Sequence, residues 1–174
     1  MSSKTLGLLF RPNSVAVVGG SDEPGTPGHV LMRNLTQGKF LGPVMPIDLE
    51  ARPIAELESY RSVDTLPLTP DLGILLCPPD EIPDYIDEFG KRGTKAVVVL
   101  SRGAFRSSHS RLKKRRMAMM DAAAPHGVRV LGPNCLGYIN PSVGLNASLA
   151  HRDALPGRVA FITQSDSLFT TVLD

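Results

Sequence analysis

Two glycines that follow an apolar run have the clearest chemical meaning in this sequence. Residues 15–18 are four apolar residues in a row, and Gly19, Gly20 and Ser21 come directly after them. A continuous apolar run is typical of a strand covered on both faces, as in a parallel sheet. The glycines let the chain turn and let a ligand approach the backbone, and a helix is predicted from about Gly28 to residue 37. Bare backbone N–H groups and the positive end of a helix would then meet at one place, which suits the phosphate of a nucleotide-type ligand.

The other reactive side chains indicate no catalytic or metal site. Cys77 and Cys135 lie in unlike contexts, without a base or the spacing of a metal site, so each is expected to be a small buried side chain. A run of four cations at residues 113–116 lies inside a predicted helix and is expected to form its solvated face. The chain has no tryptophan and few aromatic residues on which bases could stack, so nucleic acid is not an expected partner.

The elements that would position the glycine turn alternate between strands and helices. Strands are predicted at residues 15–18, 43–47, 72–77, 95–101 and 128–131, and helices at residues 28–37, 80–91 and 107–125. Within the second of these helices, Ile82, Ile86 and Phe89 form a core-facing stripe. The alternation predicts an α/β fold, a Rossmann-like doubly wound parallel sheet with helices on both faces and the ligand at the carboxyl ends of the strands.

The pattern changes after Gly132. Residues up to 157 are expected to be irregular, residues 158–163 to form a new strand, and a helix to begin at Ser167 after a turn and cap at residues 164–166. One strand and a short helix cannot make a core. We therefore expect a first domain at residues 1–140, a linker at 141–157 and the first strand and helix of a truncated second domain at 158–174. The chain would then be the front of a longer protein.

The composition is ordinary for a soluble globular protein. The 174 residues are 42 % apolar and 21 % charged, and the formal net charge is +2. The apolar patch at residues 6–10 is too short for a signal peptide or a membrane span. A cytoplasmic location without a membrane partner is therefore expected.

Several phrases, taken in order, resemble one family. Residues 9–19 read Leu-Phe-Arg-Pro-Asn-Ser-Val-Ala-Val-Val-Gly, and further matching phrases stand at residues 33–35, 42–46, 76–79, 132–137, 144–148 and 164–165. Together they resemble the CoA-binding domain of the NDP-forming acyl-CoA synthetases, which include ADP-forming acetate–CoA ligases and the α subunit of succinyl-CoA synthetase. The likeness is greatest to the synthetase-like N-terminal region of bacterial protein lysine acetyltransferases.

The resemblance implies a set of residues that contact CoA or acetyl-CoA. Gly19, Gly20 and Ser21 would form the turn under the CoA diphosphate, and Gly28 would open the helix behind it. The remaining matches follow the later strands: Pro46 at the end of the second strand beside the adenosine, Cys77, Pro78 and Pro79 along CoA, Ser101 near the pantetheine path, and Asn134 towards the thiol. None of them is expected to be catalytic, so this part alone would bind CoA without turning it over.

The same resemblance implies which other modules the whole protein contains. A second domain of the succinyl-CoA synthetase type, flavodoxin-like in fold, would carry a phosphorylated histidine beyond residue 174. ATP or ADP would act only through an ATP-grasp module, also beyond residue 174. An acetyltransferase domain, which would make CoA binding regulatory, is a further implied partner, and a homo-oligomer is left open.

Two departures from the family pattern bear on function. The family often has Asn-Pro-Lys after the second strand, where this chain has Asp48-Leu49-Glu50, and a glutamate there would repel a CoA phosphate. After Gln164-Ser165 this chain has Asp166-Ser167, where relatives often have two small residues. A carboxylate at that helix start would compete with the phosphate of a phosphohistidine, which indicates lost synthetase chemistry.

Two alternatives to CoA binding stay open at this point. An NAD(P)-binding domain of an oxidoreductase or redox sensor is favoured by Asp48, which lies twenty residues after Gly28, where a ribose hydroxyl would be held. Against it, the G-x-G-x-x-G register is missing. The third hypothesis is a domain that has lost its ligand and only mediates assembly. The carboxylates of Glu50 and Asp166 favour this hypothesis, because each would oppose a phosphate. If CoA does bind, Gly20→Glu is expected to abolish binding by filling the phosphate site.

Overall fold

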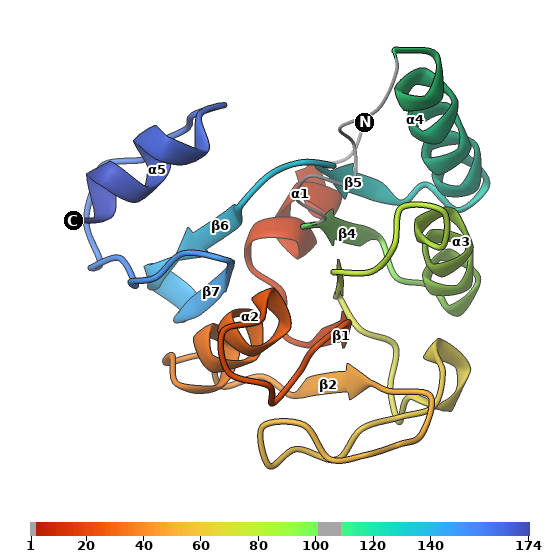
Figure 1. Cartoon of the computed structure of the whole chain (residues 1–174), viewed down its shortest axis with the longest axis horizontal. Coiled ribbons are helices and arrows are strands. Elements are labelled where there is room, and N and C mark those ends of the chain that lie inside the picture. The colour runs from red at the N-terminus through yellow and green to blue at the C-terminus, as the bar shows by residue number, and fades with distance from the viewer. Residues whose placement is uncertain (1–2, 101–108) are drawn as a thin grey trace.

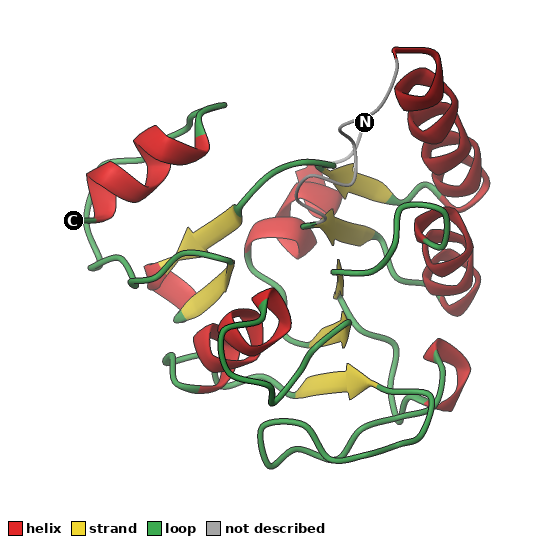
Figure 2. Cartoon of the chain, viewed as in Figure 1, coloured by secondary structure: helices red, strands yellow, loops and turns green. Residues whose placement is uncertain are grey.

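Five parallel strands form the central sheet of the computed structural model, which describes residues 3–100 and 109–174 (Figures 1 and 2). Their order in the sheet is β2-β1-β3-β4-β5, and all neighbouring pairs are parallel. The strands are β1 (Val15–Val18), β2 (Val44–Ile47), β3 (Leu72–Leu75), β4 (Ala96–Val99) and β5 (Arg129–Leu131). This is the flavodoxin-like order of doubly wound sheets, in which the strand order reverses between β1 and β3. The predicted Rossmann-like α/β fold is confirmed, with strand ends slightly shifted from the predicted ones.

Helices cover both faces of the sheet. In Figure 1, α3 (Ile82–Arg92) and α4 (His109–Ala123) lie on one side, and α1 (Ser3–Phe10) and α2 (Pro27–Thr36) on the other. The 3-10 helix η1 (Val63–Thr65) joins the α3 side, and η2 (Ala124–His126) continues α4. Alternate residues of β1 serve the two faces: Ala16 and Val18 pack in the cluster under α3 and α4, whereas Val15 and Val17 pack under α1 and α2. The continuous apolar run therefore reflects burial on both faces, as predicted.

Local signals explain where the two central helices begin and end. Thr26 caps α2, because its Oγ1 accepts a hydrogen bond from the N–H of His29 at 3.2 Å, and Pro27 occupies the first helical turn. Helix α3 ends at Gly93, whose backbone is left-handed (φ +103°), as helix C-termini favour. The predicted stripe of Ile82, Ile86 and Phe89 is fully buried.

A β-hairpin occupies part of the segment that was expected to be irregular. Strands β6 (Gly137–Asn140) and β7 (Leu145–Ser148) pair antiparallel, with the 3-10 helix η3 (Pro141–Val143) between them. The buried Asn34 of α2 donates from Nδ2 to the carbonyl oxygens of Ser148 at 2.9 Å and Ala150 at 2.8 Å. The expectation of an irregular course is therefore corrected for residues 137–148, whereas the linker at 141–157 stays a prediction. β7 alternates apolar and polar residues over only four positions, and all four are buried, whereas β6 is half-buried and shows no alternation. Runs this short give a weak strand signal in the sequence.

The N-terminal apolar patch forms the end of α1. Tyr138 donates a hydrogen bond from its hydroxyl to the carbonyl of Leu9, and the rings of Phe10 and Tyr138 meet edge to face at 5.3 Å between centroids. The hairpin therefore anchors α1 as well as α2. Within the described residues, no helix has both the length and the apolar character needed to cross a membrane.

The C-terminal segment departs from expectation in one element. Helix α5 (Asp166–Leu173) is present, and the Oγ of Ser165 caps it by accepting from the N–H of Leu168. Residues 158–163 form no strand, and Val159 and Ile162 are more than nine-tenths exposed. A strand needs a neighbour for its backbone groups, and none of the described residues pairs with this run. The prediction of a strand here is wrong for this chain, and the assignment of 158–174 to a second domain stays a prediction.

Candidate functional site

The turn after β1 lies where the strand order reverses. Gly19 has a left-handed backbone (φ +86°), and a Cβ at this position would overlap the carbonyl oxygen of Leu76, just after β3. Only glycine satisfies both conditions. The turn is thus held directly against the end of β3, in the crevice at which doubly wound sheets bind their ligands.

Gly28 lets the first turn of α2 rest on the same corner. A Cβ at Gly28 would lie 2.5 Å from the carbonyl oxygen of Gly19 and 2.9 Å from Cβ of Ser21. The backbone N–H groups of Gly20 and Ser21 make no hydrogen bond to the described residues, and Oγ of Ser21 accepts from the N–H of Glu23 at 3.0 Å. Unpaired N–H groups beside a helix N-terminus suit an anion. The structure therefore brings together Gly19, Gly20, Ser21 and Gly28, whose contact with a ligand stays a prediction.

A side chain added at Gly20 would meet the core. A Cβ at Gly20 would lie 2.8 Å from Sδ of Met32 and 3.7 Å from Cγ2 of the buried Ile54. The Cβ of a side chain at this position would point towards the core and away from the corner between the β1 turn and α2. The expectation that Gly20→Glu abolishes CoA binding stays a prediction, and the structure adds that the new side chain would first meet Met32 in the core.

Pro46 lies within β2 and not at its end. It pairs with Val17, it is buried, and its carbonyl oxygen accepts from the N–H of Tyr60 at 2.9 Å. β2 is an edge strand of the sheet, and an edge strand tolerates a proline because the missing N–H can face the side that has no neighbouring strand. The expected position of Pro46 is corrected: the strand continues to Ile47, and Asp48 is the first residue beyond it.

Asp48 holds the loop after β2. Its carboxylate accepts hydrogen bonds from the N–H of Glu50 at 2.7 Å and from Nη2 of Arg52 at 3.2 Å. Burial acts to raise the pKa of this carboxyl, but the hydrogen bonds from Glu50 and Arg52 outweigh it and hold the pKa below its usual value. Because these partners already engage the Asp48 carboxylate, the support that it gave to a dinucleotide ribose is weakened.

Cys77, Pro78 and Pro79 follow β3. Burial, helped by the charge of Glu81, raises the pKa of the Cys77 thiol to about 12. A thiol with this pKa stays neutral near pH 7 and is a poor nucleophile, so Cys77 can line a path but not attack a substrate. The next residue, Asp80, accepts from Nε of Arg115 at 3.0 Å and from Nη2 at 3.1 Å, which ties the start of α3 to α4.

Asn134 lies in the loop after β5, on the exposed surface. Its backbone is left-handed (φ +62°), a conformation that asparagine tolerates better than most residues. A Cβ at Gly132 would lie 2.5 Å from the carbonyl oxygen of Val99, so this loop abuts the end of β4. The loops after β1, β3 and β5 thus share the carboxyl edge of the sheet. Ser101 falls outside the described residues.

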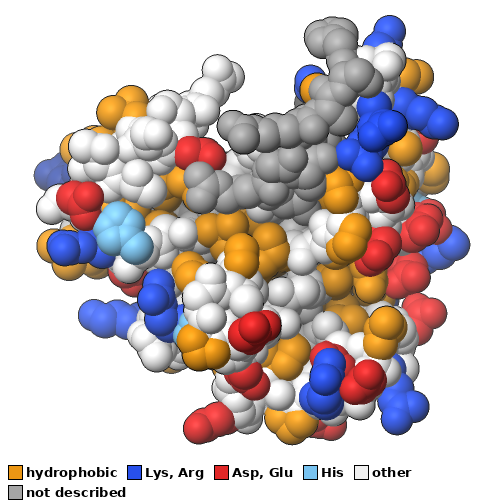
Figure 3. All heavy atoms as spheres, in the orientation of Figure 1, with side chains coloured by type: hydrophobic (Ala, Val, Ile, Leu, Met, Phe, Trp, Pro, Cys, Tyr) orange, Lys and Arg blue, Asp and Glu red, His pale blue; other side chains and the backbone are white. Residues whose placement is uncertain are grey.

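Three of the four cations at residues 113–116 lie on the surface of α4, as expected. Figure 3 shows Lys and Arg side chains gathered over α4, with Asp and Glu side chains beside them towards α3. Lys113, Lys114 and Arg116 are exposed, whereas Arg115 is mostly buried against Asp80. Within the described residues, no group of three or more His, Cys, Asp or Glu side chains could hold a metal ion.

Comparison with known proteins identifies the family. A family model described as "CoA binding domain" matches residues 13–141, which is most of the chain and includes the sheet and the β1 turn. The chain belongs to the CoA-binding domain family.

Relatives of this CoA-binding domain share its sequence and fold over nearly its full length. It is 33 % identical over 168 residues to the α subunit of acetate–CoA ligase [ADP-forming] I from Pyrococcus furiosus, covering 94 % of this chain and 36 % of that protein. It is 34 % identical over 166 residues to acetate–CoA ligase [ADP-forming] I from Archaeoglobus fulgidus, covering 95 % and 24 %. The solved structure of "dinucleotide forming Acetyl-coenzyme A synthetase 1" from Ca. Korarchaeum cryptofilum, in complex with phosphate and ADP, superposes with a TM-score of 0.88 at 35 % identity, covering 97 % and 36 %. The chain therefore spans about a quarter to a third of the length of these relatives.

The CoA-binding domain also contains site residues that the sequence did not single out. Oδ1 of Asp22 accepts from the N–H of Ala55 at 2.7 Å, which joins the β1 turn to the loop after β2. Arg52 contacts two acidic residues of that loop, Asp48 and Glu50. Asp22 could have been suspected from its place directly after the turn, whereas the role of Arg52 depends on how the loop folds back.

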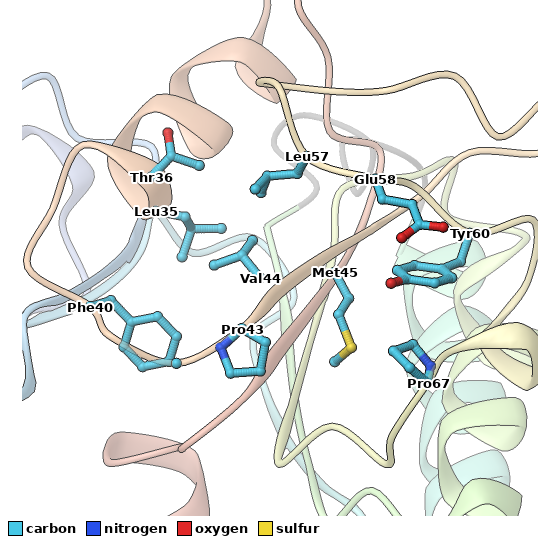
Figure 4. Close-up of a pocket in the computed structure, with 11 residues that line it drawn as sticks. Leu35, Thr36, Phe40, Pro43, Val44, Met45, Leu57, Glu58, Tyr60 and Pro67 are labelled. Atoms are coloured by element: carbon cyan, nitrogen blue, oxygen red, sulfur yellow. The ribbon is translucent and has the colours of Figure 1, made fainter.

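A cavity of about 430 Å³ lies elsewhere in the CoA-binding domain, beside the edge strand β2 (Figure 4). Its wall is mostly apolar and includes Leu35, Phe40, Met45, Leu57 and Tyr60. Among the described residues, Glu58 is the one charged residue that lines it. None of the predicted binding residues lines this cavity.

Proposed function

We propose that this domain holds CoA or an acyl-CoA for an acid–CoA ligase of the NDP-forming type. The observation that carries the proposal is the corner made by the β1 turn and α2, where Gly28 allows the helix to approach the N–H groups of Gly20 and Ser21, which have no hydrogen-bond partner among the described residues. The names of the relatives support the same activity for the whole protein. The domain would bind without turnover, while ATP or ADP acts through an ATP-grasp module elsewhere in the protein.

The pyrophosphate of CoA fits this corner on chemical grounds. Backbone N–H groups and a helix N-terminus favour negative charge without requiring a cationic side chain. The thiol-bearing arm would then run along the carboxyl edge, past the loops that contain Cys77 and Asn134. A neutral Cys77 thiol on this path would not compete chemically with the thiol of CoA.

A thermal-shift titration with CoA, acetyl-CoA, NAD and NADP tests the proposal. A ligand at a hundred times its Kd stabilises the folded state by about 2.7 kcal/mol, which raises the Tm of a chain of this size by about 5–10 °C. We expect CoA and acetyl-CoA to produce this shift. A larger shift with NAD or NADP would contradict the proposal, as would no shift with any of the four.

The matched pair Ser21→Asp and Ser21→Asn locates the site. Both side chains can accept the hydrogen bond that Oγ of Ser21 takes from the N–H of Glu23, so the turn is preserved. Only the aspartate adds a negative charge beside the N–H groups. We expect Ser21→Asp to lose the CoA shift and Ser21→Asn to keep most of it; equal shifts in the two variants would place CoA elsewhere.

One observation favours a second candidate, the regulatory region of a protein lysine acetyltransferase. Asp166 is the first residue of α5, so a carboxylate already stands at the helix end that would otherwise favour a phosphate. In this candidate the whole protein has lost histidine phosphorylation and uses CoA binding to regulate acetyl transfer. Incubating the full-length protein with ATP separates the two: acid-labile phosphohistidine supports the ligase, and its absence together with acetylation of lysine by acetyl-CoA supports the acetyltransferase.

A further inference from the structure

Three charged side chains lie close together just beyond the end of β2. The Arg52 guanidinium lies between two carboxylates, with Nη2 3.2 Å from Oδ2 of Asp48 and Nε 3.4 Å from Oε2 of Glu50. The side chains of Glu50 and Arg52 are about 70 % exposed, whereas that of Asp48 is only 17 % exposed. The glutamate that was expected to repel a phosphate is therefore paired with a cation of its own loop.

The two carboxylates are held to different degrees. Asp48 is built into the loop, since its carboxylate accepts from the N–H of Glu50 and its own N–H donates to the carbonyl of Tyr60 at 2.9 Å. Glu50 Oε2 contacts Arg52 at the surface, and exposed ion pairs of this kind contribute little to stability. An incoming anion with more charge than a carboxylate could therefore displace Glu50 from Arg52 while Asp48 keeps the guanidinium in place.

The backbone of this loop is unusual and is joined to the β1 turn. Ala51, Ala55 and Glu56 have left-handed backbones (φ +54°, +52° and +62°), which residues other than glycine rarely adopt and which occur where a fold holds a ligand clamp. The N–H of Ala55 donates to the carboxylate of Asp22, next to the turn. Ile54 lies in the core against Gly20. Arg52 is thus held within two residues of the segment that packs on the proposed anion corner.

We propose that Arg52 binds a phosphate on the ribose of the ligand, and that Glu50 is the counter-ion which this phosphate replaces. The inference rests on the proposed function, because it needs the CoA pyrophosphate at the β1 turn. In doubly wound sheets the ribose of a bound nucleotide lies beyond the end of the strand after the phosphate turn, and an arginine there accommodates a ribose phosphate. CoA has such a phosphate at its ribose 3′ position, and dephospho-CoA lacks it. A guanidinium suits this group because its planar fork can donate two hydrogen bonds to phosphate oxygens.

If Arg52 binds the ribose phosphate, this loop distinguishes CoA from dephospho-CoA, which differ only in that phosphate. A charge-assisted contact at an accessible site corresponds to about a tenfold preference for CoA over dephospho-CoA. Glu50 weakens that preference, because the phosphate has to displace it. Removing the Glu50 charge should therefore tighten CoA binding by about threefold, in line with the small energies of exposed ion pairs, and leave dephospho-CoA unchanged.

Isothermal titration calorimetry of the full chain with CoA and with dephospho-CoA tests the inference. The variants are Arg52→Gln, Arg52→Lys and Glu50→Gln, with Lys39→Gln as a control that removes an exposed cation from the loop before β2. We expect Arg52→Gln to abolish the preference by weakening CoA alone, Arg52→Lys to retain part of it, and Lys39→Gln to change nothing. The preference should also shrink as ionic strength rises.

The outcomes separate this inference from the proposed function. Wild-type chain that is folded by circular dichroism and binds neither ligand overturns the proposed function and the inference with it. If the wild type binds both ligands equally, or Arg52→Gln keeps the preference or weakens both ligands alike, only the assignment of Arg52 is overturned. If Glu50→Gln fails to tighten CoA binding, the counter-ion role of Glu50 is overturned. A CoA preference that only Arg52 variants lose supports the assignment.

Discussion

Gly28→Ala should destabilise this protein although alanine is the better helix former. Within a helix, alanine is favoured over glycine by about 1 kcal/mol. At Gly28 the new methyl group would lie 2.5 Å from the carbonyl oxygen of Gly19 and 3.0 Å from the backbone nitrogen of Ser21. Both neighbours are backbone atoms of a turn that is itself held against β3, so neither can rotate away as a flexible side chain would.

The steric term is expected to be larger than the propensity term. Overpacking by a single methyl group typically costs about 1–3 kcal/mol, and Gly28 lies in the first turn of α2, where the propensity gain is reduced because the helix is only starting. We expect a net loss of about 1–2 kcal/mol in the free energy of unfolding, which lowers the Tm of a chain of this size by about 2–8 °C. The anion corner would widen as α2 moves away from the turn, so the stabilisation by CoA should fall as well.

Gly7→Ala is the matched control. Gly7 lies on the exposed side of α1, and a Cβ there would meet no atom within 4 Å. This substitution should therefore show the propensity term alone and raise the free energy of unfolding by up to about 1 kcal/mol. Urea and thermal unfolding of both variants, with and without CoA, measure the effects. A Gly28→Ala chain as stable as Gly7→Ala, with unchanged CoA binding, would refute the argument that the turn and the helix are in fixed contact.

Two further predictions concern buried groups. Asn34→Ala should lower the free energy of unfolding by about 1–3 kcal/mol in urea titrations, because the carbonyls of Ser148 and Ala150 lose their donor. Asn34→Asp should lower it further, since the new carboxylate would face these two carbonyl oxygens. Equal stability of the wild type and both variants would contradict this anchoring of the hairpin. The raised pKa of Cys77, about 12 against 9.0 for an unperturbed thiol, predicts that a chain with Cys135→Ser reacts with a thiol reagent at pH 8 far more slowly when folded than in urea. Because the pKa of this thiol is higher in the folded state than in the unfolded state, the neutral thiol contributes stability that is fully present below pH 9 and is lost as the pH rises towards 12. Equal labelling rates in the folded and unfolded chains would show that the thiol is not buried.

The parts of the fold that follow local patterns could be predicted. The runs at 15–18 and 96–99 are continuously apolar and rich in valine, as buried strands are, and both are strands. The spacing of Ile82, Ile86 and Phe89 placed the buried face of α3. The hairpin could not be predicted in the same way, because Leu145–Ser148 contains two polar residues that are buried only through α2 and their own hydrogen bonds. The run at 158–163 has the composition of a strand, yet no described strand lies beside it.

The sequence by itself determined the strand, the glycine turn and the helix that make the anion corner, because apolar periodicity and glycine spacing act over a few neighbouring residues. Only the tertiary structure decided what surrounds that corner. The parallel register brings Leu76 against Gly19, although the two are far apart in the chain. The loop after β2 returns to Asp22 and places Arg52 beside Glu50, which partly offsets the negative charge expected at that point. Such contacts depend on strand order, crossover and loop path, and these are set by the packing of the whole sheet.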